Sequence, residues 1–165
     1  PFMKYEPRYA SDPGHPDYDQ YMSLKGMVDK MHSENGIDRN SGDISHRATS
    51  ALLRAYKNEE VRGNAALDPR ADIDGVVLSR SNDRFGDVGG RYAIMYQGDP
   101  NSSTVRTFAV PTHELTQPAE KNLEEINRVN DQRNLNQVHE RQLAYQQNQS
   151  QPGQEQPNMG SRSLF

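Results

Sequence analysis

The sequence predicts an α+β fold, in which a small antiparallel sheet of about three strands packs against two N-terminal helices and one C-terminal helix. Between residues 73 and 110, β-branched and aromatic residues are densest, and turn-forming residues bound each run. On either side of this region, apolar residues recur every three or four positions, which is the spacing of an amphipathic helix. The glutamine-rich end of the chain predicts a disordered tail.

Composition excludes several classes of partner. The chain has 165 residues, of which 32% are hydrophobic, with a net charge of -4 and no cysteine. No apolar run approaches the roughly 20 residues that span a bilayer, so we expect no membrane insertion. A nucleic-acid binder needs a basic face, and no basic cluster is present, so we expect no nucleic-acid partner. The lack of cysteine excludes a disulfide framework.

Apolar residues are sparse at both ends, and this divides the chain into four parts. Residues 1–16 contain several prolines and are expected to form an extended, flexible N-terminus. Residues 17–130 are expected to form the compact α+β domain. Residues 131–145 are predicted to be a fraying polar helix or a linker, and residues 146–165 to be the disordered Gln-rich tail.

The first predicted helix opens at Pro16-Asp17, because proline suits the first helical position and a carboxylate favours a helix N-terminus. Asn35-Gly36 ends this helix, since both residues tolerate the left-handed conformation of a helix C-cap. Its apolar residues are spaced by three, four and three positions and form one stripe: Tyr21, Leu24, Val28 and Met31.

The second and third predicted helices flank the sheet region. Ser41 or Asp43 can cap the second helix, whose buried side combines small alanines with Leu52. The third helix starts at residues 116–118, where proline again lies near the first position, and it packs through Leu123 and Ile126.

Three runs of residues are predicted to be strands. Residues 73–78 are apolar on both sides near their end, as in a central or helix-covered strand. In the middle run, Tyr92, Ile94 and Tyr96 share one face. The third run contains Phe108, and the turn-forming residues 98–103 make the hairpin loop between the second and third strands.

Residue types that support catalysis do not occur in catalytic patterns. None of the five histidines has metal-type spacing, and serine nucleophile elbows, phosphate-binding loops and kinase motifs are missing. We therefore expect no metal and no cofactor, and the residues alone favour an interaction module over an enzyme.

Asp74 has two interpretations. It lies within a strand-like run, where acidic residues are disfavoured. In the first interpretation it is a strand-end residue whose carboxylate binds a turn amide. In the second it is an exposed acid that a partner recognises.

Several motifs together suggest a known family. They occur in the following order: His15-Pro16-Asp17-Tyr18, Tyr21 ahead of Val28, Ala51-Leu52-Leu53, Ile73-Asp74-Gly75-Val76-Val77-Leu78-Ser79, Tyr92-Ala93-Ile94 and Gln97-Gly98-Asp99-Pro100, followed by the Gln-rich end. In this order they resemble the XVIPCD family, the conserved C-terminal domains of antibacterial effectors exported by Xanthomonas-type type IV secretion systems. Phe108 is expected to belong to the same core.

The chain departs from the family pattern at two places. Family members commonly carry histidine after the Ile-Asp pair, and this chain has Gly75 there. Its middle strand, which contains Tyr96, is longer than the usual one. These departures affect the details of any contact surface more than the assignment.

The resemblance implies a secretion-signal domain. Such domains are recognised in the donor bacterial cytoplasm by the type IV coupling protein, a hexameric ATPase, through its all-alpha domain. The effector is then exported through the secretion system into rival bacteria, and the Gln-rich tail assists. The resemblance also implies that a toxic enzymatic domain would lie N-terminal to this fragment, and that this chain needs no cofactor.

Six residues are expected to contact the partner: Asp74, Gln97, Gly98, Asp99, Pro100 and Arg106. No heptad run predicts a coiled coil, so we expect a monomer. The sequence is also compatible with two other functions, namely a small cell-wall hydrolase and an immunity or inhibitor protein.

Overall fold

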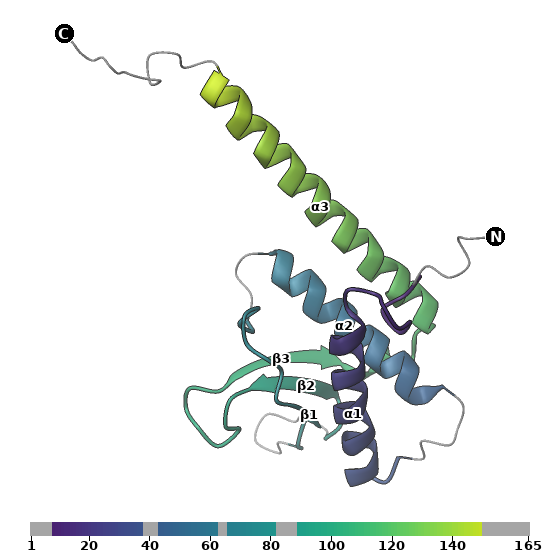
Figure 1. Cartoon of the computed structure of the whole chain (residues 1–165). Helices are drawn as coiled ribbons and strands as arrows, with labels where there is room; N and C mark the ends of the chain where they lie inside the picture. The colour runs from purple at the N-terminus through teal and green to yellow at the C-terminus, as the bar shows by residue number, and fades with distance from the viewer. Residues whose placement is uncertain (1–7, 38–42, 63–65, 82–88, 150–165) are drawn as a thin grey trace. The chain divides into compact units, whose positions relative to one another are not determined.

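The computed structural model describes residues 8–37, 43–62, 66–81 and 89–149. It confirms the predicted α+β fold, with three α-helices and one antiparallel sheet (Figure 1). The elements follow in this order: α1 (Tyr18–Glu34), α2 (Ile44–Val61), β1 (Gly75–Leu78), β2 (Tyr92–Gln97), β3 (Arg106–Pro111), the short 3-10 helix η2 (Thr112–Thr116) and α3 (Ala119–Gln149).

The sheet has the order β1-β2-β3, so β2 is its central strand. Residues 73–78 were predicted to form a central or helix-covered strand, and the second alternative holds: β1 lies at an edge of the sheet, and α1 covers one of its faces. Val76 faces the core and is 4% exposed, whereas its neighbour Val77 is 41% exposed. A run of apolar residues therefore marks a strand here without telling whether both faces are buried.

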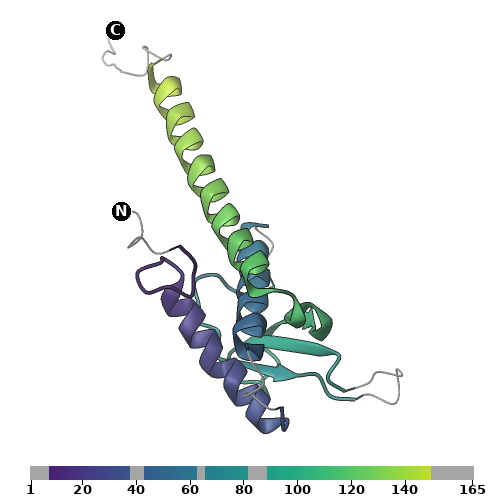
Figure 2. The same cartoon turned by 90° about the vertical axis from the view of Figure 1, so that its right-hand side faces the viewer.

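Helices α1 and α2 lie side by side (Figure 2) and form the core with one face of the sheet. The predicted stripe of α1 is buried along its whole length. On α2 the small Ala48 and Ala51 are buried beside Leu52, which allows the two helix backbones to approach closely. Val110 and Met95 complete the core from the sheet.

The segment before α1 differs from its prediction. Residues 1–16 were expected to be extended and flexible. Residues 1–7 lie outside the described residues, but residues 8–16 form turns, and Ala10 and His15 are buried. The Asn127 side chain accepts a hydrogen bond from the His15 ring (2.8 Å) and donates one to the carbonyl of Arg8 (2.8 Å). Polar side chains therefore attach this proline-rich segment to α3, which hydrophobic periodicity does not reveal.

Helix α3 belongs to two compact units, one ending at Val129 and the other beginning at Asn130. In the first unit Leu123 and Ile126 are buried in the core. In the second unit, the predicted fraying helix or linker of residues 131–145 is regular helix, which continues to Gln149. Residues 146–149 are thus helical rather than tail, and residues 150–165 lie outside the described residues.

No helix in the described ranges is both long enough and apolar enough to cross a bilayer.

Candidate interaction surface

One face of the sheet is left partly exposed by the described helices. The register places Val77 opposite Ile94, and Ile94 opposite Ala109. Because side chains alternate along a strand, Tyr92 and Tyr96 share this face. Val77 is 41% exposed and Tyr92 is 38% exposed. We call this surface the open sheet face: Val77, Tyr92, Ile94, Tyr96 and Ala109.

Tyr96 covers the start of β1. A Cβ atom added to Gly75 would lie 2.3 Å from the Tyr96 hydroxyl oxygen and 2.5 Å from its ring carbon Cζ. The missing side chain at position 75 is therefore what lets the tyrosine lie across the strand. This contact gives the open sheet face a fixed aromatic group at one end.

The hairpin end of the sheet is held by Asp74. Its Oδ2 atom accepts a hydrogen bond from the Gly98 amide (2.6 Å), and its own amide donates to the Tyr96 carbonyl (2.8 Å). Gly98 has a φ of +95°, which few residues other than glycine adopt. The structure thus shows the first interpretation of Asp74, a turn-binding carboxylate. The residue is also exposed, so recognition by a partner stays a prediction.

Beyond Gly98, the loop projects polar groups outward. Asp99 and Pro100 are exposed, and Asp99 Oδ1 accepts a hydrogen bond from the Asn101 amide (2.9 Å). Arg106 is exposed on the first position of β3. Five of the six predicted partner-binding residues, all except Gln97, therefore lie at the surface around this turn.

Gln97 was predicted to contact a partner at the surface, and this prediction is wrong. Its side chain is only 5% exposed. Its Oε1 atom accepts from the Asp68 amide (2.7 Å), and Nε2 donates to the carbonyls of Asp68 (2.8 Å) and Ala71 (3.0 Å). The side chain satisfies all these backbone groups in the connection before β1, so it is structural rather than available to a partner.

The twelve residues that the motifs predicted for the core differ in their burial. Six are buried: His15, Tyr21, Val28, Leu52, Ile73 and Val76. Leu78, Ile94 and Phe108 are partly buried, while Pro16, Val77 and Tyr92 are exposed. Most of these residues therefore contribute to packing within the fold, and only a few of them reach the surface.

His15 and Asp17 of the His-Pro-Asp motif hold the start of α1. The Asp17 amide donates to His15 Nδ1 (3.0 Å), so the other ring nitrogen carries the proton given to Asn127. The Asp17 carboxylate pairs with Lys57 of α2 at 3.1 Å, and both side chains are nearly buried. Sequence reasoning missed this ion pair because its partners are far apart along the chain.

Tyr21 and His46 form the second polar contact between α1 and α2. The phenol hydroxyl is hydrogen-bonded to His46 Nδ1, and the rings meet edge to face with centroids 5.8 Å apart. Burial of the phenol, with a smaller contribution from the Asp29 carboxylate, raises the pKa of Tyr21 to about 12. The phenol is therefore kept neutral in the folded protein.

A serine, a histidine and an aspartate also meet where α1 and α2 come together. Ser45 Oγ donates to Asp29 Oδ1 (2.6 Å), and His32 Nδ1 lies 3.2 Å from the same oxygen of Ser45. Because the serine proton points to the aspartate, the imidazole donates to the hydroxyl rather than removing its proton. In this arrangement the cluster connects two helices and does not activate a nucleophile.

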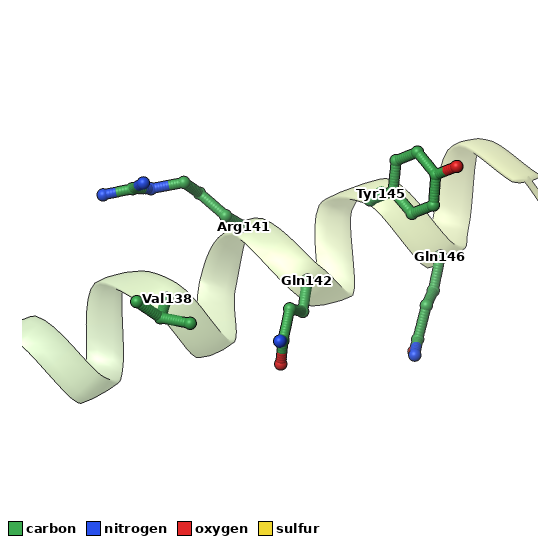
Figure 3. A pocket seen from close by; sticks show the side chains of 5 residues that line it. All are labelled: Val138, Arg141, Gln142, Tyr145 and Gln146. Carbon is green, nitrogen blue, oxygen red and sulfur yellow. The ribbon is translucent and has the colours of Figure 1, made fainter.

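The second unit presents a shallow groove on one helix (Figure 3). Val138 and Tyr145 are 46% and 65% exposed, and Arg141, Gln142 and Gln146 complete the lining. Figure 3 shows Arg141 and Tyr145 on one side of the helix and the two glutamines on the other. Sequence reasoning missed this stripe, although the spacing of Leu135, Val138 and Tyr145 indicates it.

A comparison with known proteins finds no matching family model and no matching curated protein. Within the described ranges, no group of three or more histidines and carboxylates is placed to hold a metal ion.

Proposed function

We propose that this chain is a secretion-signal domain, bound in the donor bacterium by the all-alpha domain of a type IV coupling protein ATPase before export into rival cells. The observation that carries the proposal is the ordered series of XVIPCD-like motifs, which runs from His15 to Pro100. The chain itself acts as a recognition module, and any toxic activity belongs to another part of the effector.

The open sheet face supports this role. It offers an apolar centre with two tyrosines, whose rings bury a large area at little cost in side-chain entropy. The polar turn with Asp74, Asp99 and Arg106 borders it. An apolar centre with a polar rim is the usual composition of a protein interface. We propose that the coupling protein contacts this face and this turn together.

The interior also suits an exported protein, which must unfold before it passes through a secretion channel. The hydroxyls of Thr49 and Ser50 are buried, and within the described part of the chain neither finds a hydrogen-bond partner. Each such group costs about 1 kcal/mol or more of stability. A core of modest stability can therefore fold for recognition and still open for transport.

Binding of the 165-residue chain to the purified all-alpha domain, measured by calorimetry, tests the proposal. We expect Asp99→Lys and Tyr92→Ser each to weaken binding about tenfold, because each removes a group from the proposed interface. Asp19→Lys is the matched control, since it makes the same charge change at an exposed position on α1. It should leave affinity within about twofold.

Asp74 needs a variant that separates its two roles. Asp74→Asn keeps an oxygen that accepts from the Gly98 amide but removes the charge. Weaker binding with an unchanged melting temperature would support recognition of the charge. Absence of any binding by the unmodified chain would contradict the proposal, and turnover of peptidoglycan or tight one-to-one binding to a toxin would favour the alternatives.

A further inference from the structure

A second feature lies between α2, η2 and the first turns of α3, away from the open sheet face. It is a small pocket of about 280 Å³. Its lining includes three cationic and two acidic side chains: Arg54, Lys121, Arg128, Glu114 and Glu125. Asn122 also lines it and is only 1% exposed. A volume at the low end for ligand sites fits a small molecule or one side chain.

Two residues that line this pocket each carry an unsatisfied hydrogen-bond donor. Arg54 Nε and Asn122 Nδ2 are buried, and neither finds an acceptor within the described part of the chain. Arg54 is held in place because its Nη2 atom pairs with Glu114 at 3.2 Å. Leaving a buried donor unpaired is costly, so two such donors on residues that line one pocket favour the binding of an acceptor there.

The charges of the pocket restrict what that acceptor can be. Glu114 pairs with Arg54, and Glu125 pairs with Arg128 at 2.8 Å. Lys121 forms no ion pair with any described residue, so the lining has one positive charge in excess. The pocket also includes the first turn of α3, where the helix dipole favours an anion.

We propose that this pocket binds a carboxylate. A carboxylate has two acceptor oxygens for the two unsatisfied donors, and its single negative charge matches the excess charge of Lys121. A phosphate dianion fits less well, because Glu114 and Glu125 would repel its second charge. The carboxylate can come from a small free acid or from an acidic side chain of a partner protein.

Nuclear magnetic resonance can observe both donors directly in the full chain. The probes are sodium acetate and a blocked glycine-glutamate-glycine tripeptide, each added at constant ionic strength against sodium chloride. We expect saturable shifts of the Asn122 side-chain amide and Arg54 Nε signals, with a dissociation constant on the order of millimolar. Tighter binding of the tripeptide assigns the site to a protein partner, and equal or tighter binding of acetate assigns it to a small acid.

Three variants separate a specific site from general attraction. Lys121→Gln should weaken acetate binding about threefold, and Asn122→Leu, read through the Arg54 signal, about tenfold. Arg70→Gln removes the same charge from a side chain that is 92% exposed elsewhere, and it should change affinity less than about twofold.

Three results would contradict the carboxylate site. Shifts that rise linearly without saturation, or that sodium chloride reproduces, would overturn the proposal. An Asn122→Leu variant with unchanged affinity would do the same. If that variant does not fold, Lys121→Gln decides, because Lys121 is exposed and its loss leaves the core intact.

Discussion

At the residue scale, Gln97 shows how a motif residue can be assigned to the wrong place. It belongs to a Gln-Gly-Asp-Pro sequence typical of an exposed loop, but it is the last residue of β2 and alternates with the surface residue Tyr96. Because side chains alternate along a strand, Gln97 lies on the core side of β2. There its side-chain amide can both donate hydrogen bonds to backbone carbonyls and accept one from a backbone amide. The partners at Asp68 and Ala71 could not be identified from the sequence.

Replacing Gln97 by alanine should therefore destabilise the fold. The variant removes three hydrogen bonds to backbone groups of Asp68 and Ala71. We expect a loss of about 2–3 kcal/mol in the free energy of unfolding, measured by urea denaturation. Gln137→Ala, at an exposed position on α3, should stay within about 0.5 kcal/mol of the parent. Equal stability of the two variants would refute the structural role.

Tyr21 is expected to make the free energy of unfolding depend on pH in the alkaline range. Its pKa is raised from 10.0 to about 12 in the folded state, which favours the neutral phenol there. The resulting stabilisation is complete below the unfolded pKa of 10.0 and is lost as the pH rises towards 12. The urea midpoint should therefore fall across this interval.

The Tyr21→Phe variant provides the comparison. It cannot ionise at position 21, so its urea midpoint should fall less between about pH 10 and pH 12. Burial also raises the pKa of Tyr56, but that contribution is common to both proteins. Parallel pH profiles for the parent and the variant would show that Tyr21 does not supply the effect.

At the scale of elements, helical and strand periodicity predicted the apolar faces well. The stripe of α1 is buried as expected, and the residues of β2 alternate between core and surface. The polar contacts between elements were not predictable, because Lys57 and Asn127 have no local signal that selects Asp17 and His15 as partners. The N-terminal segment was misjudged for this reason.

His15 offers a test of that segment. His15→Ala removes the hydrogen bonds to the Asp17 amide and to Asn127, together with buried ring surface. We expect a loss of about 1–2 kcal/mol in the free energy of unfolding, and faster cleavage by protease around residues 8–16. Ser23→Ala, at an exposed position of α1, is the control and should leave both measurements unchanged.

At the scale of the whole molecule, the fold class followed from the sequence because the strand-rich centre and the flanking helical stripes are separate along the chain. Only part of the candidate interaction surface could be predicted from the sequence. The turn at Gly98 was expected to be exposed, whereas the open sheet face depends on which side the helices cover, and strand alternation leaves the two sides equivalent. The pocket at Arg54 and Asn122 depends on residues from separate elements, so no local pattern indicates it.

Gly75 and Tyr96 lie opposite each other in the register of β1 and β2. A side chain at position 75 would occupy the space that the Tyr96 ring fills. A glycine at position 75 is therefore what makes room for the tyrosine at position 96. The open sheet face of this chain consequently differs in shape from one that carries histidine at that position.

The central claim is that the coupling protein recognises the open sheet face and the adjoining turn. The most direct measurement is a map of amide chemical-shift changes in the chain when the purified all-alpha domain is added. The account predicts that the largest changes fall on residues 75–77, 92–99 and 106–109. Changes confined to the outer surfaces of α1 and α2, or no changes at all, would contradict it.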